Sequence, residues 1–258
     1  MAKLEFSSYR TGDIRANLER MSIKWLDVMV AGVTGAGKST TLNTFFQKTV
    51  AEVGDGVDPK TMEVCSYKLN DVLHIWDTPG LGDGVIVDKE HERKLLDLLH
   101  KTYDDGRCGY IDMCLVIIEG SNRDMGTTYK LLNEIIVPNI QSDRILVIIN
   151  QADMAMKGRH WDKVSNVPDN VLVAYLEEQA LSIKRRVKEA TGVDIIKPVC
   201  YSAKYGWNFS RVFDMIIDHM PKERRNVDPI EQVINGMVEI LAVSLKLLTI
   251  LCQKKDAT

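Results

Sequence analysis

The chain has 258 residues, of which 45% are hydrophobic and 27% are charged, and its formal net charge is -3. This composition is typical of a soluble globular protein with one large domain, or one domain and an extension, and the even spread of basic residues does not indicate a nucleic-acid surface. Because the five cysteines are odd in number and widely spaced, and the N-terminus lacks the apolar core of a secretory signal, we expect reduced thiols and a cytoplasmic location.

Short apolar runs bounded by turn residues alternate with stretches of helical period, which predicts an α/β fold with a mainly parallel sheet. In chain order, we expect helix 13–21, strand 27–31, helix 38–46, strands 62–69 and 72–76, helix 89–103, strand 113–118, helix 127–136, strand 145–150, a polar surface excursion at 153–170, helix 171–190, strand 197–201, helix 210–219 and an apolar helix at 229–252. Asn70 and Asp71 form a hairpin turn, so one strand pair is expected to be antiparallel.

These elements divide the chain into three expected parts. Residues 1–24 form an N-terminal helical extension, residues 25–222 form the α/β domain, and residues 223–258 form a C-terminal apolar helix and tail. Charges at Glu239 and Lys246 interrupt the last helix, so we expect it to pack on the domain or on a second protomer rather than span a membrane. Peripheral membrane contact through its apolar face is the alternative.

Residues 32–39, GVTGAGKS, match the phosphate-binding pattern G-x-x-x-x-G-K-[ST] directly after a predicted buried strand and before a predicted helix. The glycines allow backbone N–H groups to surround phosphates, Lys38 reaches the β- and γ-phosphates, and the Ser39 hydroxyl coordinates Mg²⁺. The alternative is a glycine-rich turn that contains a lysine by chance. The expected nucleotide-binding residues of this loop are Gly32, Thr34, Gly35, Ala36, Gly37, Lys38, Ser39 and Thr40.

The sequence DTPG, residues 77–80, lies at the end of the third predicted strand. Asp77 is placed to hold Mg²⁺ through a water, and the glycine at position 80 allows a backbone N–H to approach the γ-phosphate. A plain β-turn is the alternative reading of DTPG alone.

Two later motifs favour guanine over adenine. Asp153, in the sequence NQAD after the fifth strand, can accept from both N1–H and the exocyclic amine of guanine, whereas adenine has an acceptor at N1. After the sixth strand, a backbone N–H at Ala203 is expected to donate to guanine O6. The expected base-binding residues are Asn150, Gln151, Asp153, Ser202, Ala203 and Lys204.

The order GVTGAGKS, DTPG, NQAD and SAK resembles the motif order of a small GTPase domain, and the form DTPGLGDG resembles the Era and TrmE branch, bacterial YfjP-type GTPases in particular. The resemblance implies a three-layer, Ras-like P-loop fold with helices on both faces of the sheet. It also implies a switch that hydrolyses GTP to GDP with Mg²⁺. Its second motif requires a threonine that binds Mg²⁺ and senses the γ-phosphate, for which Thr61 is our choice over Thr49. Thr61 as a plain strand-entry residue is the alternative.

By this resemblance, Lys38, Thr61 and Gly80 are the catalytic candidates, and Ser39, Thr61 and Asp77 are the metal ligands. Leu81 occupies the position where a Ras-type enzyme has the glutamine that orients water. We therefore expect slow hydrolysis, completed by an activating protein, a second protomer or another loop.

Two further positions depart from related families. Gly35 replaces the asparagine of potassium-dependent relatives, and the neutral Gln151 replaces a lysine beside the base. A GTP-gated assembly module with little hydrolysis and, less favoured, an ATPase remain alternatives. Arg123 is read as an exposed loop residue rather than an arginine finger. The five histidines, which show no metal-ligand spacing, are read as surface or packing residues.

Overall fold

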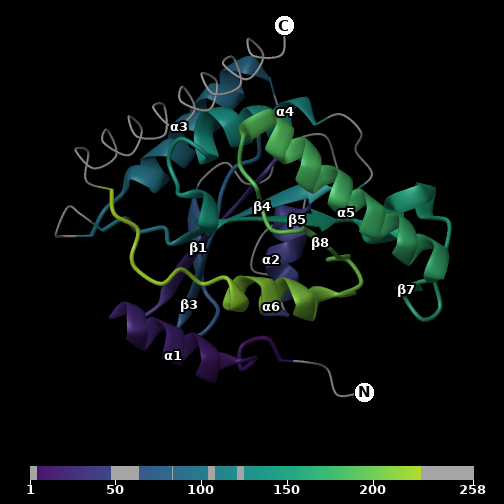
Figure 1. Ribbon diagram of the computed structural model, residues 1–258, viewed down its shortest axis with the longest axis horizontal. Coiled ribbons are helices and arrows are strands. Elements are labelled where there is room, and N and C mark those ends of the chain that lie inside the picture. Colours follow the sequence, from purple (N-terminus) through teal and green to yellow (C-terminus); the bar gives the residue numbers. More distant parts are fainter. Residues whose placement is uncertain (1–4, 48–63, 83, 104–107, 121–124, 228–258) are drawn as a thin grey trace, which may run out of the picture.

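The computed structural model describes residues 5–47, 64–82, 84–103, 108–120 and 125–227, and it contains a six-stranded sheet (Figure 1). The strand order is β2-β3-β1-β4-β5-β8, and only β2 runs antiparallel to its neighbour. This confirms the expected mainly parallel sheet with one antiparallel strand. The strands are β1 (Leu26–Gly32), β2 (Cys65–Lys68), β3 (Leu73–Asp77), β4 (Met113–Glu119), β5 (Ile145–Asn150) and β8 (Val199–Cys200).

Helices cover both faces of this sheet, as expected. The helices are α1 (Thr11–Met21), α2 (Lys38–Phe46), α3 (Val85–His100), α4 (Gly126–Lys130) with a π-helical continuation (Leu131–Ile136), α5 (Asn170–Thr191) and α6 (Phe209–Asp218). Successive residues of β1 and β4 alternate between two hydrophobic clusters, because side chains of a strand point to opposite faces. One cluster includes α3 and α5, and the other includes α1, α2 and α6, so the central strands are buried on both sides.

Several elements differ from the expectations. Helix α3 begins at Val85, four residues earlier than predicted. The sequence pattern did not indicate this start, because Val85 and Ile86 are 74% and 86% exposed and lie outside the buried apolar stripe of the helix. The expected excursion at 153–170 contains a 3₁₀ segment (Ala152–Gly158) and a small hairpin of β6 (Trp161–Asp162) and β7 (Val167–Pro168).

Strand β8 is shorter than predicted because it pairs with its neighbour β5 only at Val199 and Cys200. In the sheet that the structure describes, no strand pairs with its other edge. Pro198 has no N–H for a strand partner, and the Asn208 side chain donates to the Cys200 carbonyl at 2.7 Å.

The segment before β1 packs on α6. Phe6 stacks on Phe213 with a centroid distance of 4.7 Å and an interplanar angle of 2°. Arg10 forms ion pairs with Asp214 at 3.0 Å and Asp218 at 2.8 Å. Because Phe6 is also buried in the cluster of α2 and α6, this segment shares the core of the α/β domain.

Buried polar groups close the edge of the sheet at the amino ends of the parallel strands. Asp27 accepts from Trp76 Nε1 at 2.8 Å and from the Tyr103 hydroxyl at 2.9 Å, and its own N–H donates to Asp112 Oδ2 at 3.0 Å. Burial raises the pKa of Asp112 to about 7. Arg225, 1% exposed, donates to the carbonyls of Ile111, Asn139 and Leu99 at this edge.

Arg225 belongs to the part of the chain expected beyond the domain, yet it is fixed in the domain core. The apolar helix expected at 229–252 lies outside the described residues. Within the ranges that the structure describes, no helix is both long enough and apolar enough to cross a membrane.

Candidate nucleotide site

The phosphate-binding loop connects β1, which is buried along its whole length, to the first residue of α2. Gly35 and Gly37 have φ values of +82° and +87°, a region that L-residues with side chains rarely adopt. A Cβ on Gly37 would lie 2.2 Å from Asn150 Nδ2, so this position admits only glycine without a shift. The loop leads directly into the N-terminus of α2, where unpaired backbone N–H groups favour an anion.

Lys38 is held inside this loop. Its side chain is largely buried, and its Nζ donates to the carbonyls of Gly32 at 3.1 Å and Val33 at 3.2 Å. An ammonium kept among backbone dipoles at a helix N-terminus gives the loop a positive charge that suits phosphate.

The DTPG segment lies against this loop. The β1–β3 register pairs Asp77 with Val30, and the Thr78 hydroxyl donates to the Val30 carbonyl at 2.7 Å. A Cβ on Gly80 would lie 2.5 Å from Thr34 Oγ1 and 2.7 Å from Lys38 Nζ. Only a residue without a side chain can therefore approach Lys38 this closely.

Leu81 continues this contact through its backbone. Its carbonyl accepts from the Thr34 N–H at 2.8 Å, and it forms an isolated parallel bridge with Val33. The Leu81 side chain is 1% exposed and belongs to the cluster under α3. Leu81 thus anchors the segment in the core.

The oxygen donors at this edge fit Mg²⁺. The Ser39 hydroxyl is half-buried in the first turn of α2, and the Asp77 carboxylate is 1% exposed at the end of β3. Within the described ranges, no group of three or more His, Cys, Asp or Glu residues is placed to hold a metal ion. Mg²⁺ in nucleotide sites uses one or two protein ligands together with phosphates and waters, so this donor set suits it. Thr61 and Thr49 lie outside the described residues.

Asn150 joins the phosphate loop to the loop after β8. It is 3% exposed, its Nδ2 donates to the Ala36 carbonyl at 3.0 Å, and its Oδ1 accepts from the Ala203 N–H at 3.0 Å. Asp153, 7% exposed, accepts from the Ser202 hydroxyl at 2.6 Å. The structure therefore brings the expected base-binding residues of the two loops together.

The remaining base-site candidates, Gln151, Lys204 and Ala203, have different hydrogen-bond partners and different exposure. Gln151 Nε2 donates to the Gly35 carbonyl at 2.9 Å, so it also links the base loop to the phosphate loop. Lys204 is exposed, with its ammonium 5.1 Å from the centroid of the Tyr205 ring. The Ala203 N–H, expected to donate to guanine O6, is bonded to Asn150 here, so donation to the base requires it to exchange partners.

Sequence reasoning missed residues that support these loops from α2. The hydroxyls of Thr41 and Tyr201 lie 2.7 Å apart, and the Thr44 hydroxyl donates to the Ala203 carbonyl at 2.8 Å. The signal was available, since Thr41 and Thr44 follow the phosphate loop at helical spacing. Their partners in the loop after β8 become apparent only in three dimensions.

The burial of His91 agrees with the surface or packing role expected for the histidines, but its contact with the DTPG segment was not foreseen. His91 is 0% exposed on α3, and its Nδ1 lies 2.6 Å from the Gly80 carbonyl. His91 thus contacts the backbone of a candidate catalytic residue. Arg123 lies outside the described residues.

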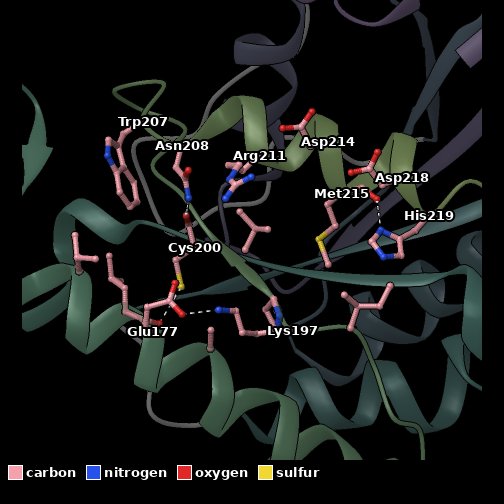
Figure 2. A pocket seen from close by; sticks show the side chains of 16 residues that line it. Glu177, Lys197, Cys200, Trp207, Asn208, Arg211, Asp214, Met215, Asp218 and His219 are labelled. Carbon is pink, nitrogen blue, oxygen red and sulfur yellow. Dashed lines mark hydrogen bonds and ion pairs between the residues drawn. The ribbon is translucent and has the colours of Figure 1, made fainter. Parts of the chain in front are cut away.

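A pocket of about 280 Å³ lies apart from these motifs, between α5, β8 and α6 (Figure 2). Glu177 and Lys197 form an ion pair on one side of it, and His219 Nδ1 lies 2.8 Å from the Met215 carbonyl on the other. Burial raises the pKa of the Cys200 thiol in its wall to about 12, which disfavours the reactive thiolate. The pocket includes none of the expected nucleotide-binding residues.

Comparison with known proteins supports the sequence motifs. A family model described as 50S ribosome-binding GTPase matches residues 27–169. The probable GTP-binding protein EngB of Lactococcus lactis subsp. cremoris is 24% identical over 145 residues, which are 55% of this chain and 70% of that protein. The probable GTP-binding protein EngB of Bacillus subtilis is 22% identical over 165 residues, which are 63% of this chain and 80% of that protein.

Solved structures share the fold. Toc33 from Arabidopsis thaliana, in complex with GDP and Mg²⁺, has a TM-score of 0.59 and 15% identity, covering 85% of this chain and 94% of that chain. Era, in complex with MgGDPNP and a segment of 16S ribosomal RNA, has a TM-score of 0.55 and 16% identity. That match covers 77% of this chain and 57% of the Era chain, so this chain spans little more than half the length of Era. These similarities confirm the P-loop fold.

Proposed function

Because the chain belongs to the family of 50S ribosome-binding GTPases, we propose that it binds GTP with Mg²⁺, hydrolyses it slowly to GDP and phosphate, and acts as a nucleotide-dependent switch. The resemblance to a small GTPase domain of the Era-like branch, inferred from the motif order and from the form DTPGLGDG, is confirmed by this family match, and Era shares the fold. One observation carries the proposal: Asn150 bonds both the phosphate loop and the loop after β8, so the lysine and the base-reading carboxylate belong to one site.

The proposed chemistry is in-line attack of water on the γ-phosphate. Lys38 and the loop N–H groups stabilise the charge that develops on the phosphate oxygens. The Gly80 backbone, which approaches Lys38 in the structure, supplies a further contact at the γ-phosphate. Bound Mg²⁺, held by Ser39, Asp77 and Thr61, would neutralise charge on the β- and γ-phosphates.

Guanine selection rests on Asp153. The Ser202 hydroxyl bonds one carboxylate oxygen and so limits the rotation of the group, which suits an acceptor for the N1–H and amine of guanine. Adenine would leave the carboxylate facing an acceptor, and such a mismatch of buried polar groups discriminates strongly.

The slow turnover follows from Leu81. Its side chain is packed in the core, so it offers no polar group to the attacking water. We propose that a partner supplies this group, either a second copy of the chain or an activating protein. A precedent exists in the chloroplast translocon components atToc33 and psToc159, for whose GTPase activity dimerization is important; a structure from that pair matches this chain with a TM-score of 0.58.

Other partners remain proposals. The family description names the 50S ribosome and Era was solved with ribosomal RNA, which makes a ribosomal partner a candidate although the charge pattern does not indicate nucleic acid. Membrane contact through residues 229–252 and a cytoplasmic location also remain proposals.

The test is titration of the purified chain with fluorescent GDP, GTP and ATP, together with phosphate release at increasing protein concentration. GDP and GTP are expected to bind and ATP is not, and Lys38→Ala should abolish binding while the exposed-site control Lys163→Ala does not. Equal affinity for ATP would refute guanine selection. Turnover that rises with protein concentration supports a homodimer, whereas no turnover at any concentration supports the assembly module.

A further inference from the structure

The segment after DTPG is held on two sides. The Leu81 carbonyl accepts from the Thr34 N–H of the phosphate loop at 2.8 Å. On the other side, the Gly80 carbonyl lies 2.6 Å from His91 Nδ1, and the Gly82 N–H donates to Asp88 Oδ1 at 2.8 Å. In an extended chain, the carbonyl of one residue and the N–H two positions later face the same way, so both bonds reach the same helix.

We call Asp88 and His91 together the α3 clasp. The two residues are three positions apart in the first turns of α3, so their side chains leave the same face of the helix. Gly82, at the end of the held segment, and Gly84, directly before α3, have φ values of +114° and +117°. Backbone in this region is accessible chiefly to glycine, so these positions are natural pivots between the segment and α3. The clasp spans the pivots and fixes the position of the segment.

The hydrogen bond to Gly80 explains why a polar ring occupies this buried position. A carbonyl oxygen only accepts, so His91 Nδ1 carries the hydrogen and donates it. The ring is 0% exposed, and its Nε2 has no hydrogen-bond partner within the part of the chain that the structure describes. Burying an imidazole is costly compared with a leucine of similar volume unless its hydrogen bond contributes. The Gly80 carbonyl is the contact that uses the polarity of the ring.

We propose that His91 is a positioning residue: by holding the Gly80 carbonyl, it keeps the DTPG backbone in register with the phosphate loop and so determines how strongly the chain distinguishes GTP from GDP. The inference rests on the proposed function, because it assumes that the γ-phosphate meets Gly80 beside Lys38. Gly80 already lies so close to Lys38 that a Cβ would be 2.7 Å from Nζ. A small displacement of Gly80 therefore changes the contacts available to the third phosphate and leaves those to GDP largely intact.

The test compares His91→Leu, which keeps an apolar volume and removes the donor, with His91→Asn, whose amide nitrogen takes the place of Nδ1. The control is His100→Leu, an exposed histidine on the same helix. Affinities for GDP and for the non-hydrolysable analogue GMPPNP are measured on the full chain, with single-turnover phosphate release and thermal melting alongside.

Loss of one buried hydrogen bond corresponds to about a tenfold change in an equilibrium constant. In His91→Leu, the preference for GMPPNP over GDP should fall about tenfold while GDP affinity changes less than about threefold. His91→Asn should keep most of the preference, and His100→Leu should keep all of it. If His91→Leu does not fold, Asp88→Ala removes the partly exposed half of the clasp, and the same loss of preference is expected.

Two results would overturn the positioning role while leaving the GTPase function intact. One is an unchanged preference in His91→Leu together with normal turnover, and the other is an equal loss in His91→Leu and His91→Asn, which would assign the effect to ring volume. A wild-type chain that binds GDP but not GMPPNP refutes the switch function and the positioning role together. If the wild-type chain shows no turnover and His91→Leu loses the preference for GMPPNP over GDP, the positioning role of His91 is supported and only the hydrolysis is refuted.

Discussion

Asn150 connects the two halves of the candidate site, so its replacement by alanine tests the arrangement directly. The mutation removes a donor to the Ala36 carbonyl and an acceptor for the Ala203 N–H, both at 3.0 Å. Asn150 is 3% exposed, so both backbone groups lose their partner in a buried place. An unsatisfied buried group costs about 1–3 kcal/mol, which gives roughly 2–6 kcal/mol for the pair.

Part of this cost is avoided when the site is empty, because the loops can separate and admit water. If about half of it arises only when the nucleotide closes the loops, the loss on binding is about 1–3 kcal/mol, which corresponds to a roughly 5- to 150-fold rise in the Kd for GDP. Fluorescence titration with GDP measures this change, and thermal melting measures the remainder.

The matched control is Asn139→Ala near the opposite edge of the sheet, where Asn139 Nδ2 donates to the Ile135 carbonyl at 2.7 Å. This control should lower stability by about 1 kcal/mol and leave GDP affinity unchanged. A Kd for GDP within threefold of the wild-type value in Asn150→Ala would show that the two loops do not depend on this amide.

Three further outcomes are expected. Gly37→Ala should lower both the melting temperature and GDP affinity, because the new Cβ would lie 2.2 Å from Asn150 Nδ2 at a φ of +87°; an unchanged melting temperature would contradict this close approach. Because the pKa of Asp112 is raised from 3.8 to about 7, its proton stabilises the folded chain below about pH 4, and this stability is lost as the pH rises through 7. Asp112→Asn should therefore raise the denaturation midpoint at pH 8 more than at pH 5, and an equal shift at both would refute the raised pKa. Gln151→Lys should raise GDP affinity a few-fold in titration, and a decrease would show that the Gln151 contact with the phosphate loop matters more than the added charge.

Much of the fold could be predicted because the central strands are buried on both faces. Runs such as 145–150 are wholly apolar up to their last residue, and the structure places β5 there without change. Elements with a weak hydrophobic pattern were less accessible. The two-residue strands of the β6–β7 hairpin are too short to show alternation, and the first turn of α3 presents exposed Val85 and Ile86.

The candidate site shows the same division. The position of the phosphate-loop residues between a buried strand and a helix could be predicted because phosphate chemistry fixes their spacing along the chain, and so could the position of Asp77 at the end of a strand; their roles stay predictions. The bridging role of Asn150 depends on Ala36, 114 positions before it, and on Ala203, 53 positions after it, and no local pattern contains that information. The burial of His91 agrees with the packing role that was expected, but its contact with the Gly80 carbonyl becomes apparent only in the fold. Thr61 stays a prediction.

The three carbonyls that Arg225 binds belong to the end of α3 and to the segments before β4 and β5. Arg225 therefore fixes the chain at the edge of the sheet that lies opposite the phosphate-binding loop. A force applied to the chain beyond Val227 would act first on Arg225 and on the segments that it binds before β4 and β5, and only then on α6. A cargo attached there would be held at the amino ends of the central strands, at the edge of the sheet opposite the nucleotide loops.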